Sequence, residues 1–179
     1  IESLKNKEAH ISLSAGNTGA LLVISRLLLK TIEGINKPAL AGLWPNQKNM
    51  NVVLDLGANI ECNEKNLVDF SCMGSALFKS LFDNERPKIA LLNIGLEENK
   101  GNDILKKTFS ILKDNKIKNF DFTGFIEGNH IMDGNVDVIV TDGFTGNIAL
   151  KTAEGTANFI TKNLKNSLNK ISMIISYNS

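Results

Sequence analysis

The chain has 179 residues, of which 42% are hydrophobic, and its 20 lysines and arginines nearly balance 19 aspartates and glutamates. This length suits one domain with a substantial core, and the interspersed charge gives no sign of a nucleic-acid surface. Two cysteines, Cys62 and Cys72, are too few for a secreted disulfide framework, and no histidines and cysteines cluster at metal-ligand spacing. We therefore expect no nucleic-acid partner, no metal and no cofactor.

The sequence shows neither a membrane-spanning segment nor a signal peptide. The apolar run 20–29 is interrupted by Ser25 and Arg26 and is too short to span a bilayer, and the N-terminus has no signal-peptide pattern. These features predict a cytoplasmic protein. The chain begins without Met and stops soon after an apolar segment, so we expect a fragment of a longer protein.

The first of three glycine turns lies near the N-terminus. Residues 11–14 alternate like a short strand, residues 15–19 form the turn, and a helix is expected over 20–31. The side chains expected on its buried face are Ile24, Leu27 and Leu28. Beside the turn, Gly16, Asn17 and Thr18 offer donors for a phosphate or carbonyl oxygen, although Asn17 or Thr18 can equally be a helix cap.

The second turn follows a buried strand. Residues 38–41 are expected to form a strand that ends irregularly at Trp44 and Pro45, and residues 51–54 form the next strand. Asp55 and Asn59 follow that strand, where ligands bind in open parallel sheets. Asp55 can equally cap a turn or pair with a lysine.

The middle of the chain alternates helices and strands. We expect a helix over 67–82, a strand over 88–95, a helix over 104–113 capped by Asp103, and a strand over 120–126. His130 follows in a loop with Glu127 and Asp133, where a general-base role is conceivable and a solvated histidine is the simpler reading.

The third turn follows the apolar run 136–140. The sequence breaks at Asp142 and Gly143 before helical spacing begins, so Gly143 and Gly146 would let backbone amides approach a ligand. Lys151 lies one or two turns into this helix and would add an ammonium group for a phosphate or an oxyanion. In the alternative interpretation, Asp142 and Thr145 simply cap the helix.

Strands that alternate with helices, each strand a nearly continuous apolar run, predict a single three-layer α/β/α domain over 1–179 with a mainly parallel sheet. The region 146–179 continues as a long amphipathic helix. It would pack on a second copy, bend back as a hairpin, or lie on a membrane surface. Its apolar stripe comprises Ala149, Ala153, Ala157, Ile160, Leu164, Leu168, Ile171 and Ile175.

Seven collinear stretches resemble the PlsX family of bacterial phosphate acyltransferases of phospholipid synthesis. They cover nearly the whole chain and are SAGNTGALL (14–22), KPALA (37–41), LDLGAN (54–59), MGSA (73–76), LLNIGLEENKGND (91–103), FTGFIEG (122–128) and DVIVTDGFTGNIALKTAEG (137–155). The chain matches roughly the middle half of a family member, which would also have a DAMGGD-type loop at its start and more sheet and helix at its end.

The resemblance implies a fold like that of isocitrate and isopropylmalate dehydrogenases and of phosphotransacetylase. It implies a homodimer, a C-terminal helical hairpin that touches the inner face of the membrane, and a glycerol-3-phosphate acyltransferase as partner. The implied reaction converts acyl-ACP (acyl carrier protein) and inorganic phosphate to acyl phosphate and free ACP.

Phosphate is itself a nucleophile, which agrees with the absence of a G-x-S-x-G elbow from the sequence. Our site hypothesis places Gly16, Asn17 and Thr18 on the phosphate. Further contacts to the phosphate or oxyanion come from Gly143, Thr145, Gly146, Asn147 and Lys151. Asp55, Asn59 and Asp142 would orient these groups or handle a proton.

Two alternatives remain open. One is another enzyme on the same architecture, either a phosphotransacetylase that acts on acyl-CoA or an NAD-dependent decarboxylating dehydrogenase. The dehydrogenase would need an arginine cluster for its substrate's carboxylates, and the chain has only Arg26 and Arg86. The other is a truncated, non-catalytic module for dimerisation and membrane association.

Overall fold

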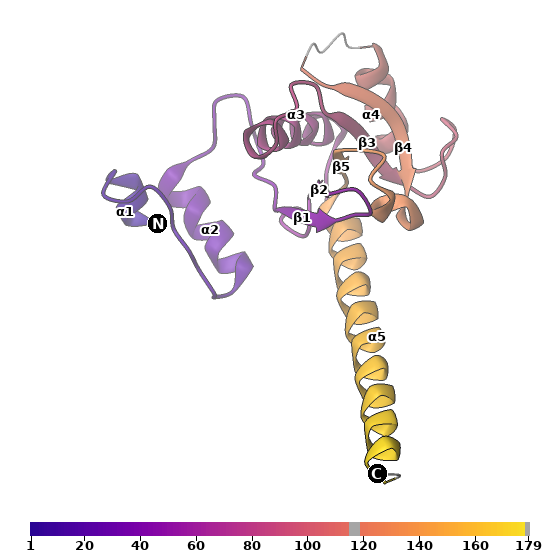
Figure 1. Cartoon of the computed structure of the whole chain (residues 1–179). Helices are drawn as coiled ribbons and strands as arrows, with labels where there is room; N and C mark the ends of the chain where they lie inside the picture. Colours follow the sequence, from indigo (N-terminus) through magenta and orange to yellow (C-terminus); the bar gives the residue numbers. More distant parts are fainter. Residues whose placement is uncertain (115–118, 178–179) are drawn as a thin grey trace.

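The computed structural model describes residues 1–114 and 119–177, with side chains described through residue 169 (Figure 1). The strands are β1 (Ala41–Pro45), β2 (Met50–Leu54), β3 (Lys88–Asn93), β4 (Asp121–Glu127) and β5 (Val138–Val140). The α-helices are α1 (Glu2–Lys5), α2 (Thr18–Leu29), α3 (Glu64–Leu81), α4 (Asp103–Asp114) and α5 (Gly143–Tyr177), and η1 (Gly128–Asp133) is a 3-10 helix.

The five strands form one sheet in the order β1-β2-β5-β3-β4. Strand β1 is antiparallel to β2, and all other neighbours are parallel. The mainly parallel α/β architecture expected from the sequence is therefore confirmed. Because parallel strands end at the same edge, the segments that follow Leu54, Asn93 and Val140 leave the sheet side by side.

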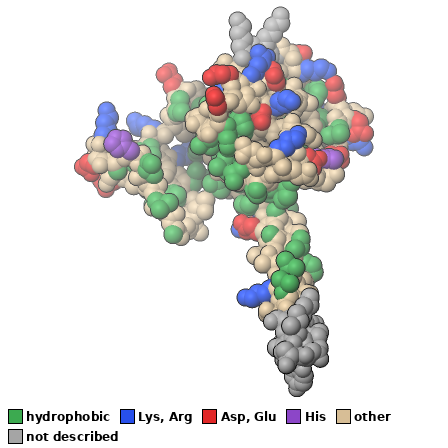
Figure 2. Space-filling view, in the orientation of Figure 1, with side chains coloured by type: hydrophobic (Ala, Val, Ile, Leu, Met, Phe, Trp, Pro, Cys, Tyr) green, Lys and Arg blue, Asp and Glu red, His purple; other side chains and the backbone are tan. Residues whose placement is uncertain are grey.

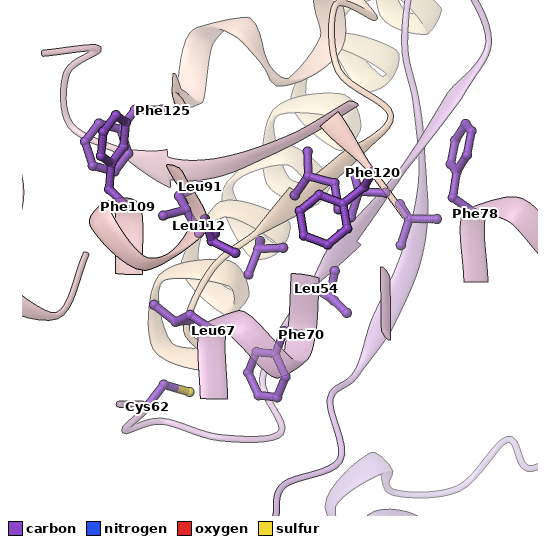
Figure 3. Packing of buried hydrophobic residues seen from close by; sticks show 14 residues of the cluster. Leu54, Cys62, Leu67, Phe70, Phe78, Leu91, Phe109, Leu112, Phe120 and Phe125 are labelled. Atoms are coloured by element: carbon purple, nitrogen blue, oxygen red, sulfur yellow. The ribbon is translucent and has the colours of Figure 1, made fainter. Parts of the chain in front are cut away.

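Side chains of alternate strand residues point to opposite faces of the sheet, and both faces are buried. Helices α3 and α4 cover one face, where Leu54, Leu91 and Phe70 belong to the cluster shown in Figure 3. The other face carries a second cluster around Trp44, Val53 and Ile139, against which the start of α5 packs. Burial on both faces explains why the strands read as continuous apolar runs.

The N-terminal part differs from expectation. Residues 11–14 form no strand, and Ile11 and Leu13 are 83% and 98% exposed. Helix α2 forms as predicted but lies with α1 to one side of the sheet (Figure 1), so Ile24 and Leu27 are exposed rather than buried. The reason is that apolar residues surround most of α2, so their spacing does not single out one buried face.

Other local details also differ from the expectations. The first strand is Ala41–Pro45 rather than 38–41, and its partner β2 places Pro45 opposite Met50. Pro45 is tolerated there because β1 is an edge strand. Asn102, not Asp103, caps α4, since its Oδ1 accepts the Leu105 amide at 2.9 Å. The segment after β4, expected as a loop, is the 3-10 helix η1.

Helix α5 packs on the sheet only at its beginning. Ala149, Leu150 and Ala153 contact the second core cluster, and the remainder of the helix extends away from the sheet (Figure 1). Its hydrophobic side chains are visible on this extension (Figure 2), where Phe159 and Ile160 are 69% and 58% exposed. Leu164 and Leu168 continue this face, whereas the Ile171 and Ile175 side chains lie outside the described residues.

Within residues 1–114 and 119–177, no helix combines the length and the hydropathy that crossing a bilayer requires.

Candidate active site

The beginning of α5 is in direct contact with the loop that follows β2. The Gly143 amide donates to the Asn59 carbonyl at 2.8 Å, and a Cβ on Gly143 would collide with the Asn59 backbone. A Cβ on Gly146 would overlap the Asp55 carbonyl oxygen. Both glycines are therefore required by the close approach of two backbones, which joins the second and third glycine turns into one structural unit.

Asp55 organises this unit from inside. Its fully buried carboxylate accepts five hydrogen bonds of 2.7–3.1 Å, from the amides of Leu40, Gly57, Ala58 and Asn59 and from the Asn59 side chain. Asn59 Nδ2 also donates to the Pro38 carbonyl at 2.7 Å. A carboxylate held by so many donors fixes the loop, so this geometry favours the orienting role over proton transfer.

Asp142 is the N-terminal cap of α5. Its Oδ1 accepts the Thr145 amide and its Oδ2 accepts the Thr145 hydroxyl, both at 2.8 Å. Asn17 has the corresponding role in α2, where its Oδ1 accepts the Ala20 amide at 3.0 Å, and the Gly16 amide donates to Ser14 Oγ at 3.2 Å. Asp142 and Asn17 therefore make the capping contacts that the alternative interpretation expected, and Thr145 donates both hydrogen bonds to Asp142.

Two hollows flank the junction of loop 55–59 with α5. The first, which we call the leucine-lined hollow, has a volume of about 320 Å³ and lies between α2, the loop and α5. It brings together Thr18, Asn147 and Lys151 from the predicted site, with Gly57 beside them. Its other lining residues are Gly19, Leu21, Leu22, Ser25, Ala39, Leu40, Leu56, Ala58 and Leu150.

The second, which we call the helix-cap hollow, has a volume of about 700 Å³. The cap residues of three helices line it: Asn63 of α3, Asn102 of α4 and Asp142 of α5. Thr145 and Lys37 also line it, and the Lys37 ammonium donates to the Glu61 carbonyl at 2.7 Å. The remaining lining residues are Asn36, Ile60, Glu61, Cys62, Asn66, Leu67, Ile104, Leu105 and Phe144.

The environment of Cys62 disfavours the thiolate form of its side chain. Burial, followed by the nearby Asp55 carboxylate, raises the pKa of Cys62 above its ordinary value. Its Sγ lies 3.7 Å from the Asn59 carbonyl oxygen. A thiol with a raised pKa is a poor nucleophile at neutral pH, which agrees with the interpretation of Cys62 as a small buried hydrophobe.

Five of the predicted site residues line a hollow, and these five divide between the two hollows, whereas Gly16, Asn17, Asp55, Asn59, Gly143 and Gly146 line neither. Lys151 lies nine positions after Asp142, which corresponds to about 13 Å along the axis and to opposite sides of the helix. Asp142 and Thr145 line the helix-cap hollow, whereas Asn147 and Lys151 line the leucine-lined hollow. The structure does not bring Asp142 and Lys151 to one point.

Asn147 and Lys151 differ in how firmly they are held. Asn147 Nδ2 donates to the Leu56 carbonyl at 3.2 Å and contacts Gly57, where a Cβ would lie 2.9 Å from that nitrogen. The Lys151 side chain is 64% exposed, and its ammonium lies 2.7 Å from Glu154 Oε2. An exposed ion pair exchanges readily, so the ammonium remains available to an anion.

Several residues at these sites were not singled out from the sequence. Lys37 and Asn102 line the helix-cap hollow, and the KPALA and GND stretches that contain them were the available signal. His130, considered as a base, pairs with Asp133 at 2.7 Å and lines neither hollow. Among the described residues, no three His, Cys, Asp or Glu side chains are grouped as metal ligands would be.

Known structures share this architecture. A phosphotransacetylase, EutD, from Staphylococcus aureus superposes with a TM-score of 0.59 at 16% identity, over 87% of this chain and 54% of that chain. A branched-chain phosphotransacylase from Enterococcus faecalis superposes with a TM-score of 0.61 at 16% identity, over 84% of this chain and 60% of that chain. At this identity the likeness establishes the fold alone.

Sequence similarity establishes the family. Residues 1–175 match the model of the family described as fatty acid synthesis protein, so the chain belongs to that family. A phosphate acyltransferase of Pelagibacter ubique is 65% identical over 168 residues, which are 94% of this chain and 50% of that protein. One of Rhizobium leguminosarum is 45% identical over 95% of this chain and 49% of that protein. The PlsX resemblance is thereby confirmed, and the chain spans about half the length of these relatives.

Proposed function

We propose that the protein containing this chain transfers an acyl group from acyl-ACP to inorganic phosphate, giving acyl phosphate and free ACP. The observation that carries this proposal is the leucine-lined hollow. The hollow is lined by Thr18, Gly57 and Asn147, which come from the three glycine turns or from the helices that follow them. Lys151 and a largely apolar wall complete the lining. An acyl thioester and phosphate need this combination of donors, one cation and an apolar surface.

The reaction requires no protein nucleophile. A phosphate oxygen attacks the thioester carbonyl carbon, the carbon–sulfur bond breaks, and the departing thiolate takes up a proton, since a free thiol has a pKa of about 8.5. The protein would contribute donors for the developing oxyanion and the relative placement of two substrates. Placement alone is worth roughly 7–11 kcal/mol in favourable model reactions.

In this proposal Lys151 and Asn147 contact the phosphate or the oxyanion. Thr18, with Gly16 and Asn17 before it, presents the N-terminus of α2 to the phosphate. The hydrogen bonds around the junction fix the loop that carries Gly57 and the start of α5 that carries Asn147. The residues that make these bonds therefore act as positioning residues: the Gly143–Gly146 turn, Thr145, Asp55, Asn59 and Asp142.

The test is acyl phosphate formation from phosphate and either dodecanoyl-ACP or palmitoyl-ACP. The assay compares this chain with one extended at both ends to the length of the relatives. Activity in both would place the essential groups within residues 1–179, and activity only in the longer chain would place some of them outside. Activity in neither would overturn the proposal and favour the non-catalytic module. Palmitoyl-CoA run in parallel separates the ACP-dependent reaction from a phosphotransacetylase-like one.

We further propose that the exposed half of α5 is a contact surface for a second copy or for the cytoplasmic face of a membrane, where a glycerol-3-phosphate acyltransferase would take up the product. The support is the exposed face of Phe159, Ile160, Leu164 and Leu168. Sedimentation equilibrium tests the dimer, and co-sedimentation with anionic vesicles tests membrane contact. Replacing Ile160 and Leu164 by Ser should weaken whichever association is observed.

A further inference from the structure

The leucine-lined hollow has two chemically different ends. Thr18 lies at the start of α2, and Ser25 lies seven residues later, about 10 Å farther along the helix axis. Leu21 and Leu22 lie between them on the same helical face, since positions i, i+3, i+4 and i+7 share one side of a helix. The α2 wall of the hollow therefore runs from the Thr18 hydroxyl across two leucines to the small Ser25 side chain, and Lys151 and Asn147 line the hollow from α5.

The size of the hollow limits what it can contain. An apolar cavity of about 150 Å³ accommodates a benzene molecule with six carbon atoms. At about 320 Å³, this hollow has room for roughly a dozen carbon atoms. A ligand with an anionic or carbonyl head and a medium-length alkyl chain matches both the volume and the polarity of the lining.

We propose that the acyl chain of the transferred group lies along this face of α2 and that Ser25 determines the chain length that the hollow accepts. The carbonyl end lies near Lys151 and Asn147, and the methyl end reaches Ser25. This inference rests on the proposed acyl transfer and adds the placement of the chain and a specificity-determining residue.

Ser25 is suited to this role by its size and position. It is the smallest side chain of α2 in the lining apart from Gly19, and it lies at the end of the α2 wall opposite to Thr18. A large side chain at this position would occupy the space of the terminal carbons and leave the region beside Thr18 and Lys151 unchanged. A long chain would therefore be excluded, while a short chain would still fit.

Helix α2 also provides a matched control. Val23 is 57% exposed and does not line the hollow, although it is only two residues from Ser25. Val23→Phe adds the same aromatic ring to the same helix as Ser25→Phe, but on its outer side. Any general effect of added bulk on α2 should appear equally in both variants.

The experiment is calorimetric titration of the 179-residue chain with octanoate, decanoate and dodecanoate below their aggregation concentrations. Backbone amide spectra of the same samples identify the residues that respond. We expect affinity to rise with chain length, with amide shifts at residues 18–25, 56–58 and 147–151. Ser25→Phe should weaken dodecanoate binding at least tenfold and change octanoate binding less than twofold, and Val23→Phe should change neither.

A second variant keeps the test decisive if Ser25→Phe does not fold. Leu22→Ala enlarges the hollow and should shift the preference towards longer chains. The inference would be overturned if the wild-type chain binds none of the three, if Ser25→Phe weakens all of them equally, or if the shifts lie along the exposed face of α5. Binding does not require turnover, so this outcome is separate from failure of the acyl-transfer assay.

Discussion

The Asp55 carbonyl oxygen lies where a Cβ on Gly146 would have to be placed, so the loop after β2 and the first turn of α5 are in backbone contact. We predict that Gly146→Ala destabilises the fold by about 3 kcal/mol, the upper part of the range for overpacking, because neither backbone segment can yield without losing its hydrogen bonds. Chemical denaturation followed by circular dichroism measures this loss.

Gly155 is the control for that substitution. It lies in the same helix, and nothing is within 4 Å of the position that its Cβ would occupy. Gly155→Ala should stabilise the helix by roughly 0.5–1 kcal/mol, because alanine has the higher helix propensity. If the two substitutions had the same sign and size, the close contact at Gly146 would not be a determinant of the fold.

The buried Asp55 carboxylate gives a second prediction about stability. Asp55→Ala would leave the partly buried amides of Gly57, Ala58 and Asn59 without their acceptor, and each such donor costs about 1–3 kcal/mol when it is shielded from water. We expect a total loss of at least about 3 kcal/mol, with a smaller loss for Asp55→Asn, which keeps the shape and one acceptor oxygen. The exposed Asp83→Ala is the control, and urea denaturation is the measurement. A loss below about 1 kcal/mol for Asp55→Ala would contradict the anchoring role.

Substitutions of Asp142 distinguish a helix-capping role from a role in proton transfer. Asn and Asp are similarly good caps, so Asp142→Asn should keep nearly all the stability, whereas Asp142→Ala should lose about 0.5–2 kcal/mol. If Asp142 only positions α5, Asp142→Asn should retain acyl phosphate formation within about tenfold, because no proton passes through it. Asn102→Ala, which removes the cap of α4, is the control for stability. A much larger loss of turnover in Asp142→Asn would show that the carboxylate itself takes part.

The thiol of Cys62 should react slowly. Burial and the Asp55 carboxylate raise its pKa above the ordinary value of a thiol, so little thiolate is present at neutral pH. In a Cys72→Ser background, iodoacetamide should modify Cys62 at least tenfold more slowly than free cysteine, and denaturant should abolish this protection. Rapid modification at pH 7 would instead indicate an activated thiol.

The same raised pKa makes stability depend on pH. The folded thiol remains protonated at a pH where the unfolded thiol has begun to ionise, so the unfolded state binds fewer protons there. The contribution of Cys62 is therefore complete below the unfolded pKa and is lost as pH rises through the folded value. The unfolding free energy should fall above about pH 9, and less steeply in Cys62→Ala than in the wild-type chain.

The strands and the carboxyl edge of the sheet were predictable from the sequence because residues 51–54, 88–93 and 138–140 are nearly continuous apolar runs. The environment of α2 was not, because Leu21, Leu22, Ile24 and Leu27 do not define a single stripe. Local hydrophobicity indicated a helix there but could not show which side faces the hollow.

The candidate site was predicted as a set of residues but not as an arrangement. The close approach of Gly143 to Asn59 depends on tertiary contacts between distant segments, which local spacing does not encode. The separation of Asp142 from Lys151 could be predicted from the sequence, because side chains nine positions apart lie on opposite sides of a helix. Applied to α5, this rule predicts that the two side chains lie in different places.

The most direct measurement of the central claim is the turnover of Lys151→Ala in acyl phosphate formation, made in the shortest active chain, with Lys162→Ala from the exposed half of α5 as control. We predict at least a hundredfold loss of turnover, the loss typical of an oxyanion donor. The melting temperature should change by less than about 4 °C, because an exposed ion pair contributes little to stability. Turnover equal to that of Lys162→Ala would contradict the assignment of the leucine-lined hollow as the site of acyl transfer.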